Sequence, residues 1–170
     1  MSFTKQTQNS STLDIPMGGL GFTSPDKSVL QTFVGSCVAI CLYDSAAKIA
    51  GMAHVMLPKN NTSEQTPKPE GKFVDVAINV LLDKLISAGA KQTRLKAKMA
   101  GGASVFQTEG NKNVFNIGVR NVDAIREILA EKKIPILAED VGKKGGRWII
   151  FDVASQEMTI KDRAKGVTTI

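Results

Sequence analysis

The chain has 170 residues, of which 42% are hydrophobic and 22% are charged, with a formal net charge of +6 at pH 7. This length suits a single domain with a substantial core, and the composition excludes collagen-like, disordered and membrane-embedded proteins. The basic balance alone would suit a nucleic acid, an anionic membrane surface or an acidic protein. Because the basic residues are scattered and only 5% of residues are aromatic, we expect a solvated basic surface and no nucleic-acid partner.

The N-terminal segment predicts a flexible tail. Residues 1–13 are rich in Ser, Thr, Gln and Asn without periodicity, and no apolar block follows a basic start, so no secretory signal is visible. The longest apolar run, residues 34–43, is far shorter than the roughly 20 residues that span a bilayer. We therefore expect a cytoplasmic protein without an integral membrane segment, with one domain over residues 14–170.

Two apolar runs that follow a glycine-rich turn at residues 17–21 predict a β-hairpin. Residues 29–44 and 49–57 are both rich in strand-forming side chains, and the short polar segment between them suits a hairpin connection. A turn centred on Ser45 and Ala46 places Cys37 directly opposite His54. Opposed side chains in an antiparallel pair have Cβ atoms about 5 Å apart, close enough for an imidazole to meet a sulfur atom.

The later elements follow from apolar spacing and from turn residues. In chain order we expect a long loop at 58–72, a helix at 73–88, a strand at 94–99 ending in a close backbone approach at 100–103, a helix at 118–132, and strands at 134–140, 147–153 and 157–161. The glycine-rich basic segment 142–147 lacks the helix of a phosphate loop, so we expect a hairpin turn there. This order predicts an α+β fold, an α/β sandwich in which a largely antiparallel mixed sheet packs with two main helices.

Cys37 is the first candidate catalytic residue. It follows Gly35 and Ser36 in an apolar run, and a small buried core cysteine is the alternative interpretation of that position. A thiol of ordinary pKa is mostly protonated at neutral pH, so a nucleophilic cysteine needs a nearby base. His54 is the only histidine of the chain and could supply that base, although a core histidine bonded to a carbonyl is its alternative.

The neighbouring residues suggest supporting roles and exclude others. Gly35 and Ser36 would let backbone N–H groups face a reacting carbonyl, or else form a β-bulge. Thr32 could orient the imidazole or the substrate, or serve only as a strand former. One histidine with Cys37 and Cys41 cannot make the usual zinc set, so we expect no metal and no cofactor. On one strand the two cysteines would lie about 13 Å apart, beyond the roughly 7 Å that a disulfide spans.

Four segments together resemble the CheD family of chemoreceptor deamidases. They are TFVGSCVAICLYD at 32–44, GMAHVMLP at 51–58, AKMAGGA at 97–103 and NIGVRN at 116–121. The resemblance runs in order over roughly residues 30–153, which is far more specific than any single motif. It implies that Cys37 and His54 are the catalytic pair and that Thr32 assists them.

The same resemblance implies an activity and partners. The expected reaction is hydrolysis of glutamine side chains to glutamate through a cysteine thioester, on the cytoplasmic helices of methyl-accepting chemotaxis receptors. Family members also bind the CheC phosphatase, which is therefore an expected partner. Two alternatives stay open: hydrolysis of receptor glutamyl methyl esters at the same site, because a thiolate attacks esters too, and a chiefly regulatory role as a binding partner of CheC.

Overall fold

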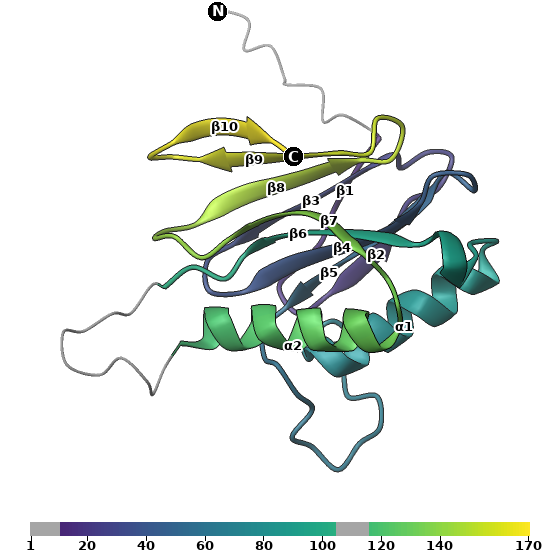
Figure 1. The fold of residues 1–170 in the computed structure, drawn as a ribbon, viewed down its shortest axis with the longest axis horizontal. Helices are drawn as coiled ribbons and strands as arrows, with labels where there is room; N and C mark the ends of the chain where they lie inside the picture. The colour runs from purple at the N-terminus through teal and green to yellow at the C-terminus, as the bar shows by residue number, and fades with distance from the viewer. Residues whose placement is uncertain (1–10, 105–115) are drawn as a thin grey trace, which may run out of the picture.

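The computed structural model describes residues 11–104 and 116–170, and these residues form two β-sheets and two α-helices (Figure 1). The elements in chain order are β1 (Thr12–Asp14), β2 (Leu20–Phe22), β3 (Val29–Val34), β4 (Val38–Asp44), β5 (Ile49–Val55), α1 (Val74–Ser87), the 3-10 helix η1 (Gln92–Arg94), β6 (Lys96–Gly101), α2 (Ile117–Glu131), β7 (Ile136–Val141), β8 (Arg147–Asp152), β9 (Glu157–Asp162) and β10 (Gly166–Thr169). The predicted α+β class and both main helices are confirmed.

The molecule has three layers. Sheet A has the strand order β1-β3-β8-β9-β10, and sheet B has the order β2-β5-β4-β6-β7. Each sheet is antiparallel except for one parallel pair, β1 with β3 in sheet A and β6 with β7 in sheet B. Both helices pack on one face of sheet B, while sheet A covers the other face (Figure 1). Within the described residues, no helix covers the outer face of sheet A.

Strand β4 lies in the middle of the sandwich, and every residue in it is buried. Its alternate side chains enter two different clusters. Val38, Ile40 and Leu42 pack under the helices, whereas Ala39 and Cys41 face sheet A. A strand covered on both faces reads as a continuous apolar run, which explains why the sequence shows no alternation here.

The single strand expected over residues 29–44 is wrong. Its first part forms β3 in sheet A and its second part forms β4 in sheet B, with Gly35, Ser36 and Cys37 crossing between the sheets. Because the inward faces of both sheets are apolar, hydrophobicity continues through the crossing and hides it.

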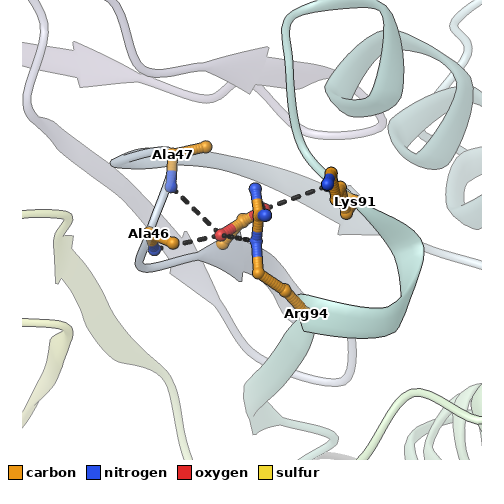
Figure 2. A network of polar contacts seen from close by, with 5 residues as sticks. Ala46, Ala47, Lys91 and Arg94 are labelled. Carbon is orange, nitrogen blue, oxygen red and sulfur yellow. Dashed lines mark hydrogen bonds and ion pairs between the residues drawn. The ribbon is translucent and has the colours of Figure 1, made fainter.

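The hairpin register is also corrected, because Ala39 lies opposite His54 and the position opposite Cys37 falls beyond the end of β5. The turn is centred one residue later than expected. The Asp44 carboxylate accepts the N–H groups of Ala46 and Ala47, which stabilises a longer turn than the one expected (Figure 2). The register shift is two residues, and an even shift leaves every side chain on the face that was expected.

The hairpin turn is joined to the segment that follows α1. The buried Asp44 also accepts the Lys91 N–H at 3.0 Å and pairs with the Arg94 guanidinium at 2.9 Å (Figure 2). Although burial opposes the charged form, these donors lower the Asp44 pKa to about 2. The carboxylate therefore holds the turn of the hairpin against the start of β6.

Three further predictions concern the N-terminal tail, the segment 142–147 and membrane-spanning helices. Of the predicted tail, residues 1–10 lie outside the described residues, while Thr12 and Leu13 belong to β1. The segment expected to be a hairpin turn at 142–147 instead connects β7 in sheet B with β8 in sheet A, so that prediction is wrong. Neither helix in the described part of the chain has the length and apolar character that a membrane span requires.

Candidate active site

The crossing at Gly35, Ser36 and Cys37 is held by the end of β6. The Gly102 N–H donates to the Cys37 carbonyl at 2.8 Å, and the Ala103 N–H donates to the Gly35 carbonyl at 2.9 Å. Gly101 has a φ of +120°, and a Cβ atom there would lie 2.4 Å from the Cys37 carbonyl oxygen. The close backbone approach expected at 100–103 is therefore confirmed, and its partner is the crossing that carries the cysteine.

These two carbonyl bonds orient the peptide planes of the crossing. In a trans peptide the N–H points opposite to the C=O. Because the Gly35 carbonyl points to Ala103, the Ser36 N–H of the same peptide points away from it. The N–H of Cys37 itself faces the Cys37 thiol.

Cys37 is the accessible thiol. It is half-buried and packs against the cluster between the two sheets, whereas Cys41 is fully buried. Burial raises the pKa of the Cys37 thiol, and the bond from its own N–H only partly opposes this effect. Burial also raises the pKa of Cys41, despite the nearby Lys98 charge. At neutral pH both sulfurs are thiols, so Cys37 needs a base to react as a nucleophile.

His54 lies in β5 on the face toward sheet A, and its side chain is buried. Its Nδ1 is 2.8 Å from the Thr32 hydroxyl oxygen, which is itself 2.8 Å from the Ile15 carbonyl. A hydroxyl has one proton, and the carbonyl can only accept it. Thr32 therefore donates to Ile15 and accepts the Nδ1–H of His54.

This arrangement fixes the chemical state of the imidazole. With the proton on Nδ1, the Nε2 atom of neutral His54 carries a free lone pair. Burial lowers the His54 pKa below its usual value, so the ring is neutral at pH 7. The Nε2 atom is buried and has no hydrogen-bond partner among the described residues, Cys37 Sγ included. An unpaired buried nitrogen of this kind is unusual and suits a general base.

A cavity of about 420 Å³ opens beside Thr32 and His54. Its lining comprises Asp14, Ile15, Met17, Gln31, Thr32, Phe33, His54 and Trp148. Cys37 is not among the residues that line it. Phe33 and Trp148, the aromatic part of the lining, were not predicted from the sequence. Strand alternation was the available signal, because an inward Thr32 requires an outward Phe33.

A buried ion pair between Arg147 and Asp140 contacts the glycine segment at Gly101. Arg147 is buried and donates to the Asp140 carboxylate at 2.7 Å, to the Gly101 carbonyl at 3.2 Å and to the Gly142 carbonyl. It pairs in register with Val34, the last residue before the crossing. The ends of β3, β6 and β7 are thus tied together next to Cys37. Only the folded structure brings these residues together, since Arg147 and Gly101 are distant in sequence.

The described residues hold no group of three or more His, Cys, Asp or Glu side chains that could bind a metal ion. Among the predicted site residues, the structure brings Thr32 and His54 into direct contact. It packs Cys37 against the apolar cluster between the two sheets and places Gly35 and Ser36 at the crossing. The arrangement can deliver a proton acceptor, a thiol and a backbone donor to one region.

Comparison with known proteins identifies the family. The family model described as CheD chemotactic sensory transduction matches residues 56–162. A protein from Halalkalibacterium halodurans named chemoreceptor glutamine deamidase CheD is 41% identical over 89% of this chain and 94% of its own length. This chain belongs to the CheD family.

Two other CheD relatives extend the comparison. One from Bacillus licheniformis, with the same name, is 42% identical over 86% of this chain and 87% of its own length. One from Clostridium novyi, named probable chemoreceptor glutamine deamidase CheD, is 38% identical over 95% of this chain and 99% of its own length. A solved Neisseria meningitidis structure covers 78% of this chain and 63% of its own, with a TM-score of 0.46 and 10% identity.

The CheD matches bear differently on the parts of the site. The family model begins at residue 56, so it includes the glycine segment and Arg147 and leaves out Thr32, Cys37 and His54. The alignment to the Halalkalibacterium protein spans 152 residues, and too few remain at either end to exclude these three residues. Both halves of the site therefore lie in regions that this chain shares with named CheD proteins.

Proposed function

We propose that this chain is a protein-glutamine deamidase that hydrolyses glutamine side chains of chemoreceptors to glutamate and releases ammonia. The names of the CheD relatives support this activity and substrate class. The observation that carries the site assignment is the free lone pair on buried His54 Nε2, on the sheet face where the accessible thiol packs. Two unpaired cysteines suit a reducing compartment, so we place the protein in the cytoplasm.

The first half of the reaction forms a thioester. The Cys37 thiol proton moves to His54 Nε2 while the sulfur attacks the carboxamide carbon of the glutamine. The resulting oxyanion accepts the Ser36 N–H, whose direction is set by the bond between Gly35 and Ala103. The carbon–nitrogen bond then breaks, and the proton on Nε2 leaves with the nitrogen as ammonia.

The second half returns the enzyme to its starting state. Nε2 takes a proton from a water molecule, and the hydroxide oxygen bonds to the thioester carbon. The carbon–sulfur bond breaks, the sulfur regains its proton from His54, and glutamate leaves. Thr32 keeps Nδ1 protonated throughout, so the same nitrogen accepts and returns each proton. For this cycle the Cys37 side chain turns toward Nε2, since the two atoms share no hydrogen bond at rest.

Mass spectrometry of a receptor cytoplasmic fragment tests this proposal. Deamidation adds about 1 Da for each glutamine, whereas hydrolysis of a methyl ester by the same thiol removes about 14 Da. We expect the receptor fragment to gain mass with wild type and with the control Cys41→Ala, and its mass to stay unchanged with Cys37→Ala. A loss of mass would favour the methylesterase alternative, and no change with wild type would contradict a hydrolytic function.

The CheC phosphatase is a further proposed partner, supported only by the family resemblance. If the chain acts chiefly as its regulator, Cys37→Ala would bind CheC and leave receptor signalling nearly intact. The deamidase proposal instead requires that Cys37→Ala abolish the mass gain and the signalling output that depends on it.

A further inference from the structure

The end of β6 carries a peptide group that is held from both sides. Its carbonyl belongs to Gly101 and accepts the Gly142 N–H at 2.9 Å and the Arg147 guanidinium at 3.2 Å. Its N–H belongs to Gly102 and donates to the Cys37 carbonyl at 2.8 Å. In a trans peptide these two groups point in opposite directions, so this one peptide lies between Arg147 and Cys37.

Helix α2 packs against the same peptide from a third side. A Cβ atom at Gly102 would lie 3.0 Å from the Gly118 carbonyl oxygen, and one at Gly118 would lie 2.4 Å from the Gly102 carbonyl oxygen. Only glycine allows two backbones to approach so closely. The 101–102 peptide is therefore confined by its neighbours, and a movement of it would displace the Cys37 carbonyl as well.

Arg147 holds the carbonyl side of this peptide. The residue is 1% exposed, and its guanidinium also donates to the Asp140 carboxylate at 2.7 Å, to the Asp140 carbonyl at 2.9 Å and to the Gly142 carbonyl. A planar guanidinium carries its donors in a fixed fork, so it sets the directions of the groups that it bonds. A charged donor on the Gly101 carbonyl also polarises the peptide, which strengthens the bond from Gly102 to Cys37.

Stability alone does not account for a buried ion pair at this position. The cost of moving two charges out of water offsets most of their attraction, and apolar residues of similar volume are often at least as stable. An apolar pair could not donate to the carbonyls of Gly101 and Gly142. Arg147 therefore supplies an orientation that packing alone would not give.

A second carboxylate–arginine pair lies at the other end of β4. This strand begins at Val38, directly after Cys37, and ends at Asp44, which pairs with Arg94 at 2.9 Å. The hydrogen bonds of Asp44 go to the hairpin turn and to Lys91, away from the crossing. The two pairs therefore allow an effect on stability to be separated from an effect on Cys37.

We infer that Arg147 is a positioning residue for deamidation, and this inference rests on the proposed deamidase function. Arg147 acts through the 101–102 peptide. By fixing the Cys37 carbonyl, this peptide fixes the backbone that carries the thiol at the distance and angle from which the sulfur attacks a carboxamide carbon. Asp140 pairs with the guanidinium and keeps it in place. Contact between Arg147 and the substrate is not required.

The kinetics of Arg147→Met test this inference, with Asp44→Ala as the control. Methionine fills similar space without donors, and Asp140 keeps Lys143 as an ion-pair partner at 2.7 Å. With the receptor fragment we expect kcat to fall about 10- to 100-fold and KM to stay within about twofold, because a misplaced nucleophile affects only the chemical step. Asp44→Ala should lose stability and keep its kcat. A wild-type kcat in Arg147→Met, or equal losses of kcat in the two variants, would overturn the inference.

Amide hydrogen exchange followed by NMR gives a readout that does not depend on catalysis. In Arg147→Met the Gly102 amide should exchange at least about tenfold faster than in wild type, because fewer bonds then hold its peptide. The Lys91 amide, which donates to Asp44, is the internal control and should exchange at the wild-type rate. If Arg147→Met does not fold, Arg147→Lys takes its place, with the same changes expected in a weaker form.

The outcomes separate the two proposals. Unchanged exchange at Gly102 would show that Arg147 does not hold the peptide and would overturn the inference. Faster exchange with a wild-type kcat would overturn it as well, since the contact would then serve the fold alone. If wild type gives no mass gain, the deamidase function fails, and exchange at Gly102 still decides whether Arg147 holds the peptide next to Cys37.

Discussion

The two ends of the β4–β5 hairpin hold buried polar groups in opposite conditions. At the turn, the Asp44 carboxylate accepts hydrogen bonds from three backbone N–H groups and from Arg94 (Figure 2). At the open end, His54 Nε2 is buried and has no partner within residues 11–104 and 116–170. A buried acceptor without a donor costs about 1 to 3 kcal/mol. The same hairpin therefore contributes stability at one end and keeps a reactive lone pair at the other.

The pKa values show the same contrast. Donors around Asp44 lower its pKa, so its charge is stabilised by the fold. Burial lowers the pKa of His54 and raises that of Cys37, so the fold disfavours charge on both. Such a pair rests as a neutral imidazole and a neutral thiol. In the proposed mechanism, the Cys37 thiol transfers its proton to His54 only as the sulfur attacks a substrate carbonyl. This limits side reactions of a free thiolate.

His54→Gln removes the proposed base at the open end of the hairpin and should have the largest effect on kcat of the substitutions considered. Glutamine fills similar space but cannot take the thiol proton, so we expect kcat to fall by about 10²- to 10⁴-fold. The free energy of unfolding should stay within about 1 kcal/mol of wild type, because only one buried hydrogen bond, from Nδ1 to Thr32, is affected and the glutamine amide is also a donor. Single-turnover deamidation and denaturant unfolding measure the two quantities. A variant that kept most of its kcat would remove His54 from the mechanism.

Asp44→Ala removes the carboxylate at the turn end of the hairpin and should lower stability without changing catalysis. The N–H groups of Ala46, Ala47 and Lys91 lose their acceptor. The Arg94 side chain, 37% exposed, loses its ion-pair partner but can be hydrated. We expect a loss of about 2 to 4 kcal/mol in the free energy of unfolding. The kcat of the folded fraction should not change. Asp44→Asn, which keeps one acceptor oxygen, is the control and should lose less.

The acid dependence of unfolding sharpens this result. The folded pKa of Asp44, about 2, lies below its ordinary value of 3.8, so its stabilisation is present above pH 3.8. It is lost as the pH falls from 3.8 through about 2. Asp44→Ala should lack this part of the acid dependence. An equally steep loss of stability in the variant would assign it to other carboxylates.

The contrast also explains what the sequence could predict. The spacing of apolar residues was sufficient for α1 and α2, because each helix buries one stripe. It was insufficient to place the break between β3 and β4, since both sheets present apolar faces to the same core. The register error arose from the Asp44 side chain, whose bonds to the turn are not visible in a propensity pattern.

The candidate site was predictable in part for a related reason. The shift in register was even, so Cys37 and His54 kept the same face although they are not directly opposed. Thr32 lies in the same apolar run as Cys37, yet it reaches His54 from the other sheet because the chain crosses at Gly35. Arg147 joins strand ends that are far apart in sequence, and no local pattern announces such contacts.

Thr32→Val tests the link that fixes the imidazole, and its effect should be the smallest of these substitutions. Valine keeps the burial of His54 but removes the acceptor of its Nδ1–H, so the proton no longer has a preferred nitrogen. We expect kcat to fall about tenfold on the pH plateau, while Thr32→Ser should restore most of it.

The pH profile of the same variants distinguishes orientation from simple loss of packing. Because burial holds the His54 pKa below its usual 6.5, the acidic limb of wild-type kcat should have its midpoint below pH 6.5. Thr32→Ser should keep that acidic limb. A plateau in Thr32→Val equal to that of wild type would show that Nε2 needs no help from Thr32, and the contrast between the hairpin ends would then depend on burial alone.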